Sequence, residues 1–145
     1  MNRAILTTIL YLFVLNCDCI CFAGQLRDAV LNNSTGEAQL LIENGAQLNV
    51  KDVNGWTALH VAAKFYSEDA ARIMIIKGAD INARDKNGYT PLHWAAIRDS
   101  KAVTRLLIKK AINVNAKDKK GFTPLHYARK NSETKKLIED AGGVE

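Results

Sequence analysis

Cysteine is scarce in this chain and is confined to one end of it. All three cysteines, Cys17, Cys19 and Cys21, fall among the first 21 of 145 residues. A spacing of two is too short for an ordinary structural disulfide, and no distal Cys or His pair completes a zinc-binding pattern. The rest of the sequence therefore has to fold without disulfides and without a structural zinc site.

Long apolar runs and blocks of like charge are missing as well. The longest apolar run extends from Ala4 to Leu15, broken only by Thr7 and Thr8, and Asp18 interrupts its continuation. This is short of the roughly 20 residues that a membrane-spanning helix requires. The net charge is +5, but no block of five or six like charges occurs, so we expect the solvated faces of a helical stack more than a surface that binds nucleic acid or lipid.

Recognisable catalytic patterns are also lacking. The sequence shows no nucleophilic serine context, no Cys and His pair and no glycine-rich loop that could cradle a phosphate. We therefore expect a protein that is not an enzyme and that uses no cofactor and no metal. With 48% hydrophobic and 24% charged residues, the composition is that of one folded domain.

What the sequence does contain is an internal repeat. One tetrapeptide occurs three times, each copy 33 residues after the last: Thr57-Ala58-Leu59-His60, Thr90-Pro91-Leu92-His93 and Thr123-Pro124-Leu125-His126. The flanking residues repeat in the same register: Asp52, Asp85 and Asp118; Gly55, Gly88 and Gly121; Ala62, Ala95 and Ala128. Three copies in register with the same neighbours make a chance match untenable, and fixed periodicity predicts a stacked architecture.

The period and the Thr-Pro-Leu-His core resemble the ankyrin repeat, and the resemblance covers nearly everything after residue 23. It implies an all-α solenoid of stacked helix-turn-helix units joined by β-hairpin-like loops. We expect a partial N-terminal repeat at residues 24–51, complete repeats at residues 52–84 and 85–117, and a shorter, more polar capping repeat at residues 118–145. The threonines suit helix N-caps, with Pro91 and Pro124 at the first helical position.

Three positions depart from the repeat pattern. Gly78 marks a helix end that commonly requires a positive φ, and the equivalent residue one repeat later is Ala111. Family members usually carry glycine between the paired helices, where this chain has Tyr66 and Asp99. Aspartate tolerates the left-handed region better than tyrosine does, so we expect strain at Tyr66 and Ala111.

The repeated histidines and aspartates are expected to be structural. Stacked helices lie about 8 to 10 Å apart, so histidines one repeat apart cannot easily share a zinc ion that each must reach at about 2 Å. The resemblance implies that His60, His93 and His126 bond to neighbouring backbone and tie one repeat to the next. The aspartates are expected to order the hairpin turns through bonds from carboxylate to backbone.

The resemblance also implies that a partner is bound by the hairpin tips and by the first helix of each repeat. The expected hairpin contacts are Val53, Asn54, Trp56, Lys86, Asn87, Tyr89, Lys119, Lys120 and Phe122; the expected helix contacts are Lys64, Phe65, Ile97, Arg98, Lys130 and Asn131. Trp56, Tyr89 and Phe122 share one repeat position and form an aromatic row beside Lys and Arg, the residue types that anchor protein interfaces. The alternative is that these rings pack against the next hairpin. Trp94 and Tyr127 are expected in the core.

Residues 1–23 do not follow the repeat and resemble a secretory signal peptide. Arg3 gives a positive start, the apolar run follows, and Cys21-Phe22-Ala23 places small residues where signal peptidase cleaves. We expect cleavage between Ala23 and Gly24, which would deliver the protein to a periplasm or outside the cell. The alternative is an uncleaved N-terminal membrane anchor.

Together these features predict an exported, monomeric, non-catalytic module that binds a protein through its hairpin tips and concave helical face. After cleavage no stable membrane insertion is expected. The alternative function is binding of nucleic acid or of an anionic surface through the basic, aromatic-containing face, which would weaken steeply with salt.

Overall fold

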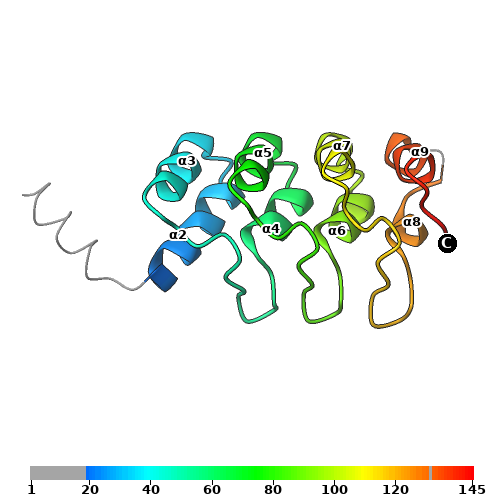
Figure 1. The fold of residues 1–145 in the computed structure, drawn as a ribbon, viewed down its shortest axis with the longest axis horizontal. Coiled ribbons are helices and arrows are strands. Elements are labelled where there is room, and N and C mark those ends of the chain that lie inside the picture. Colours follow the sequence, from blue (N-terminus) through cyan, green and yellow to red (C-terminus); the bar gives the residue numbers. More distant parts are fainter. Residues whose placement is uncertain (1–18, 131) are drawn as a thin grey trace, which may run out of the picture.

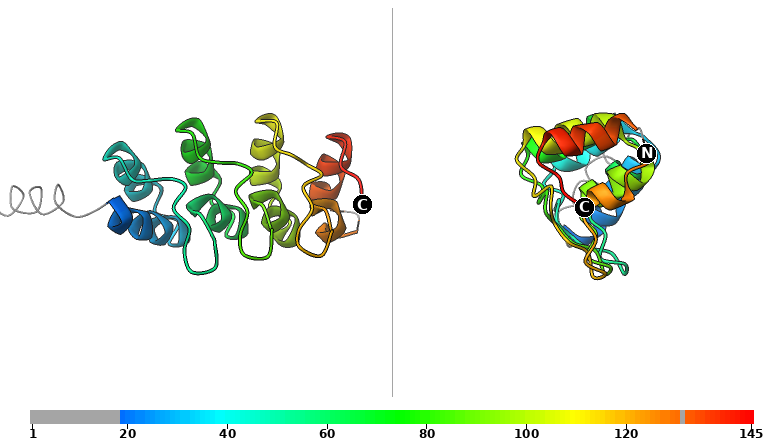
Figure 2. Two further views of the ribbon diagram at one scale, coloured as in Figure 1. Left: turned by 60° about the horizontal axis from the view of Figure 1, so that its bottom comes forward. Right: turned by 90° about the vertical axis from the view of Figure 1, so that its right-hand side faces the viewer.

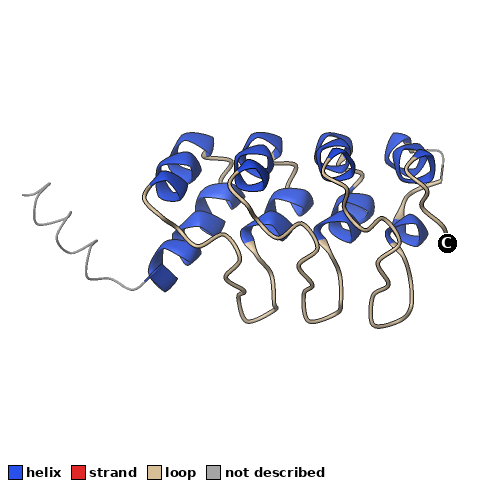
Figure 3. Cartoon of the chain, in the orientation of Figure 1, coloured by secondary structure: helices blue, strands red, loops and turns tan. Residues whose placement is uncertain are grey.

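The computed structural model describes residues 19–130 and 132–145, and in this part of the chain all regular secondary structure is helical (Figure 3). The helices follow one another as α2 (Cys19–Leu31), α3 (Thr35–Glu43), α4 (Ala58–Lys64), α5 (Glu68–Ile76), α6 (Pro91–Arg98), α7 (Lys101–Lys109), α8 (Pro124–Tyr127) and α9 (Glu133–Asp140). The predicted all-α solenoid is confirmed.

The helices form two layers of a one-dimensional stack. The inner helices α2, α4, α6 and α8 lie side by side, and the outer helices α3, α5, α7 and α9 form the second layer (Figure 1). Each outer helix except α9 leads into a long loop that projects away from both layers before the next inner helix begins, and these hairpin loops lie in a row (Figure 2). The inner helices and the hairpin loops therefore share one continuous surface.

Each inner helix after α2 begins where the repeated threonine predicts. Thr57, Thr90 and Thr123 are the N-caps of α4, α6 and α8, and the prolines of α6 and α8 occupy the first turn. In α4 and α6 the threonine forms a capping box with the histidine three residues later. This pairing satisfies backbone N–H groups that a helix start otherwise leaves without partners.

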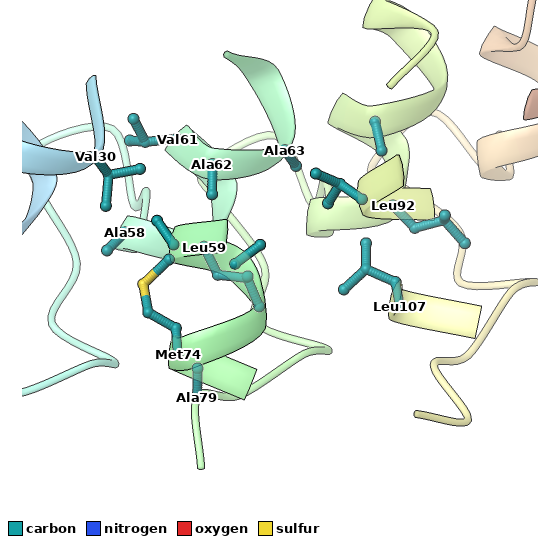
Figure 4. Packing of buried hydrophobic residues seen from close by; sticks show 14 of the residues in the cluster. Val30, Ala58, Leu59, Val61, Ala62, Ala63, Met74, Ala79, Leu92 and Leu107 are labelled. Carbon is teal, nitrogen blue, oxygen red and sulfur yellow. The ribbon is translucent and has the colours of Figure 1, made fainter. Parts of the chain in front are cut away.

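Alanines let the two layers approach closely, and larger apolar side chains fill the space between them. Ala62, Ala63, Ala95 and Ala96 are fully buried. Leu59 and Met74 pack within one repeat, and Leu92 and Leu107 occupy the same positions in the next (Figure 4). Because this cluster of buried residues runs from α2 to α9, every repeat depends on its neighbours for burial, as in other stacked repeats.

The hairpin loops are organised by the repeated aspartates, as the sequence predicts. Oδ1 of Asp85 accepts hydrogen bonds from the backbone N–H of Asn87 at 2.8 Å and of Tyr89 at 2.9 Å. Asp52 and Asp118 make the equivalent bonds in their loops. A carboxylate that accepts two backbone N–H groups in this way fixes the turn locally.

Successive hairpins approach so closely that only glycine fits between them. Gly88 has a φ of +83°, and a Cβ built there would lie 2.9 Å from the backbone nitrogen of Lys119. The contact brings the N–H of Lys119 to the carbonyl of Asn87 at 3.0 Å, and the preceding pair of hairpins repeats the arrangement at Gly55. These bonds hold the row of hairpins in register.

The histidines join one repeat to the next in two of the three positions. Nε2 of His60 lies 3.0 Å from the carbonyl oxygen of Tyr89, and Nε2 of His93 lies 3.2 Å from that of Phe122. Because a carbonyl can only accept, Nε2 carries the proton and Nδ1 accepts from the threonine N–H. His126 differs: it is exposed and stacks on Phe122, with ring centroids 3.9 Å apart. The predicted linking role is thus confirmed for His60 and His93 and is wrong for His126.

The departures from the repeat pattern are accommodated in strained backbone. Tyr66, Asp99 and Ala111 have φ values of 65°, 57° and 57°. At the outer-helix ends, the closing bond from residue 79 to the carbonyl of residue 74 is 2.9 Å long, whereas the equivalent bond after Ala111 is 3.4 Å long. The expected strain at Ala111 is therefore visible as a longer hydrogen bond.

The two ends of the stack also deviate from a regular repeat. The sequence places the start of the first helix next to residue 24, but α2 already begins at Cys19, and Ala23 is buried. At the other end the tail folds back, so that Val144 accepts a bond from Thr123 Oγ1 at 2.6 Å and donates one to Asn115 Oδ1 at 2.8 Å. The Asn115 bond is equivalent to those that Asn49 and Asn82 accept from the backbone of the next repeat.

None of the described helices is long and apolar enough to cross a bilayer. Residues 1–18 of the predicted signal segment, which spans residues 1–23, lie outside the described residues, and residues 19–23 belong to α2.

Candidate partner-binding surface

The hairpin tips expose most of the side chains that the sequence predicts for them. The side chain of Val53 is 81% exposed, an unusual position for a branched apolar residue. The polar tip residues Asn54, Lys86, Asn87, Lys119 and Lys120 are exposed as well. Since the hairpins lie in a row (Figure 2), these side chains form one edge of the surface.

The predicted contacts on the inner helices are exposed to different degrees. Phe65, Arg98 and Lys130 are exposed, whereas Lys64 and Ile97 are half-buried. They lie at the C-terminal ends of α4 and α6 and just after α8. Asn131 lies outside the described residues. The inner-helix ends form the second edge of the surface, opposite the hairpin tips.

The aromatic row has contacts inside the protein. Trp56 and Tyr89 are half-buried and only Phe122 is exposed. Trp56 meets Trp94 edge to face at 4.8 Å between centroids, and Tyr89 meets Tyr127 in the same way at 5.4 Å. Such pairs contribute about 1 kcal/mol beyond area burial, so the rings join neighbouring repeats. Contact of the row with a partner stays a prediction.

Trp94 and Tyr127 are half-buried and pack against the core, so the expectation that they lie in it is met only in part. Their polar atoms bond to the hairpin aspartates. Nε1 of Trp94 and Nε1 of Trp56 each donate to Asp85 Oδ2 at 3.1 Å. Tyr127 Oη donates to Asp118 Oδ2 at 2.6 Å.

Asp118 illustrates how these contacts fix the charge of a hairpin aspartate. Burial raises the pKa of the Asp118 carboxyl, but hydrogen bonds from Tyr127 Oη and from two backbone N–H groups outweigh it, so that the pKa lies below its ordinary value. Burial and the Asp118 carboxylate both raise the pKa of the Tyr127 hydroxyl. The pair therefore stays as carboxylate and neutral phenol.

Lys64 is held over aromatic rings. Its Nζ lies 4.4 Å from the ring centroid of Trp56, 5.0 Å from that of Trp94 and 5.3 Å from that of Phe65. Each contact is a cation–π interaction, which stabilises by about 0.5 to 1 kcal/mol at exposed sites. The ammonium group is thus held at the end of α4 by rings, which leave its charge in place.

Several residues that the sequence prediction missed also belong to this surface. A groove between α2, α4 and the first hairpin is lined by the apolar residues Leu31, Trp56, Val61 and Phe65 and by the charged residues Arg27, Asp28 and Asp52. Leu31 precedes Lys64 by one repeat, so the periodicity alone could have identified it. The partial first repeat concealed it, because that repeat lacks its own hairpin.

Tyr66 is the second omission. The residue is 53% exposed, its Oη donates to the carbonyl of Arg98 at 2.7 Å, and the Arg98 guanidinium lies 5.8 Å from its ring centroid. A bulky residue with a positive φ on a surface is uncommon. Its position directly after the predicted contact Phe65 could have identified Tyr66 as part of this surface. From the sequence, Tyr66 was expected only to be a site of strain.

Metal coordination has no candidate among the residues described, since nowhere in residues 19–130 and 132–145 do three His, Cys, Asp or Glu side chains gather as ligands.

Comparison with protein families gives a match over most of the chain. A family model described as ankyrin repeats, in three copies, matches residues 26–85 and 66–142. No curated protein matches the chain. The match begins within α2 and continues past the end of α9, and the chain therefore belongs to the ankyrin-repeat family.

Proposed function

We propose that this chain is a non-catalytic module that binds a protein partner through the hairpin tips and the inner-helix ends. Ankyrin repeats are generally protein–protein interaction modules. The observation that supports this surface is the placement of exposed large apolar side chains. Five of them, Leu31, Val53, Phe65, Tyr66 and Phe122, lie on the hairpins or at inner-helix ends. Exposed apolar side chains gathered on one face, flanked by charged residues, are typical of interaction sites.

The test is capture of the partner by the full chain from its own cells, with quantification by mass spectrometry. Replacing Val53 and Phe65 with serine removes two apolar contacts from the proposed surface. The matched control replaces Leu40 and Ile76 with serine as well; these residues are 61% and 67% exposed on the outer helices. An anchoring side chain contributes about 2 kcal/mol, so we expect a loss of affinity of roughly thirtyfold or more in the first variant.

The control variant is expected to capture the partner as the unchanged chain does. If the Leu40 and Ile76 variant loses the partner while the Val53 and Phe65 variant keeps it, the proposed surface is wrong. If the unchanged chain captures no protein at all, the proposed function is wrong.

We further propose that the protein is exported and that residues 1–23 are removed between Ala23 and Gly24. This rests on the positive start, the apolar run and the small residues before the bond. The bond lies within α2, so cleavage would have to precede folding of that helix. The intact mass of the protein recovered outside the cytoplasm tests the proposal: loss of the mass of residues 1–23 supports it, and a retained Met1 contradicts it.

A further inference from the structure

We infer that the partner presents an acidic segment. A bulky apolar side chain enters the groove between α2, α4 and the first hairpin, and carboxylates that follow it lie along the inner-helix ends toward α8. The inference rests on the proposed function and specifies the chemistry of what that surface binds.

The first observation is how the charges are paired. Within the described residues, all ion pairs lie on the outer helices and the C-terminal tail: Arg72 with Glu68, Lys101 and Arg105 with Glu133, and Lys135 with Glu139 and Glu145. The cations of the hairpin tips and inner-helix ends make none of these pairs. They are Lys64, Lys86, Arg98, Lys119, Lys120 and Lys130. The binding surface therefore keeps its positive field for an incoming group.

The second observation is that two of these cations are held in place by aromatic rings. Lys64 Nζ lies over three ring faces, and the Arg98 guanidinium lies beside the ring of Tyr66. A salt bridge would have cancelled the charge, whereas a ring restrains the side chain and leaves its N–H donors available. Restraining a side chain before binding lowers the entropy cost of using it. Lys64 is therefore the cation best prepared to receive a carboxylate.

The third observation is the position of the groove beside Lys64. Trp56 and Phe65 line the groove and also contact the Lys64 ammonium. A side chain lodged between Leu31, Val61 and Phe65 would hold the following residues of its segment over Lys64. Asp28 and Asp52 lie at the groove itself together with Arg27, so the positive excess is on the far side, toward Arg98 and Lys130. Because the apolar groove lies at α2 and α4 and the positive excess lies toward Arg98 and Lys130, the bound segment has a defined direction along the stack.

Selection from a library of random linear twelve-residue peptides displayed on phage, against the full chain, tests the inference directly. We expect the selected peptides to share one bulky apolar residue with two or more Asp or Glu on one side of it. Synthetic copies should bind Lys64→Gln and Arg98→Gln at least tenfold more weakly than the unchanged chain. The matched control Lys77→Gln, at the exposed end of α5, should change affinity less than twofold.

Intrinsic fluorescence locates the bound peptide, because Trp56 and Trp94 are the two tryptophans of the chain and both contact Lys64. Binding at the inferred place should change their emission. Selected peptides without acidic residues, affinity that Lys64→Gln leaves intact, or emission that saturating peptide does not alter would each overturn the inference. The proposed function would survive those outcomes, since partner capture is measured separately.

A single-stranded oligonucleotide, dT20, tests whether this surface binds phosphate groups in preference to the carboxylates of a peptide. It is expected to displace the selected peptides poorly at physiological salt. If dT20 binds more tightly than any selected peptide and its affinity falls steeply with salt, phosphate recognition replaces the inference.

Discussion

At the residue scale, the positions with positive φ show where this chain departs from an ideal repeat. Gly45, Gly78 and Gly142 occupy three of the four outer-helix ends, with φ between 86° and 94°, and Ala111 occupies the fourth. A residue with a Cβ in this region costs about 1 to 2 kcal/mol. The exposed side chain of Ala111 gains little burial in return, so the end of α7 is a weak point.

Replacing Ala111 with glycine should therefore stabilise the protein by about 0.5 to 1 kcal/mol, after allowance for the greater freedom of glycine in the unfolded chain. The matched control is Ala141→Gly, at the end of α9, where φ is −85° and no strain is relieved. We expect that control to be neutral or destabilising. Urea unfolding of both variants measures the difference, and equal effects at the two sites would show that Ala111 is not strained.

The linking histidines make stability depend on pH. Burial lowers the pKa of His60 and of His93, against the opposing influence of the carbonyls of Tyr89 and Phe122. Nearby Asp85 and Asp118 also raise these pKa values, whereas Lys51 and Arg84 lower them. Below about pH 6.5 the unfolded chain therefore binds protons that the folded chain does not, so stability falls as the pH falls.

We expect the urea midpoint to be lower at pH 5.5 than at pH 7.5. The lowered pKa of Asp118 acts in a separate window, because stability linked to it is lost only as the pH falls below its ordinary value of 3.8. A midpoint that does not change between the two pH values would contradict the role given to His60 and His93.

At the element scale, the inner helices are short and are stabilised mainly by their neighbours. α8 has four residues and α4 has seven, well below the length at which an isolated helix is stable in water. Their stability comes from the shared core and from the bonds between successive hairpins. A single buried side chain should therefore affect the stack far beyond its own helix.

Leu92, which is fully buried in α6, tests this dependence. Leu92→Ala should destabilise the protein by about 2 to 5 kcal/mol through lost burial and the cavity left behind. Leu40→Ala, at a side chain 61% exposed on α3, is the matched control and should change stability by less than about 0.5 kcal/mol. Thermal unfolding followed by circular dichroism measures both, and a melting temperature unchanged in Leu92→Ala would mean that the repeat register is wrong.

At the scale of the whole molecule, the periodicity carried most of the prediction. The helix starts at the repeated threonines and the hairpin turns follow from residues that recur every 33 positions, and both were predicted. The features that the periodicity did not predict lie in the first and last repeats. In the last repeat His126 is exposed and stacks on Phe122, and in the first repeat α2 begins at Cys19, because no repeated threonine marks its start there.

The binding surface was predicted less completely than the fold. Repeat position assigns a side chain to a face, and it placed Val53, Phe65 and Arg98 correctly on the exposed one. It does not reveal contacts between unlike positions of neighbouring repeats. Only the three-dimensional structure therefore revealed the edge-to-face contact of Trp56 with Trp94 and the cation–π contacts of Lys64 with three rings.

The central claim is that one face of the stack, made of hairpins and inner helices, binds the partner. Hydrogen–deuterium exchange of the full chain with and without its captured partner tests this most directly. Protection on binding is expected at residues 52–56, 85–89 and 118–122 and at the C-terminal ends of α4 and α6. Exchange in α3, α5 and α7 should be unchanged. Protection confined to those outer helices, with the hairpins unaffected, would contradict the claim.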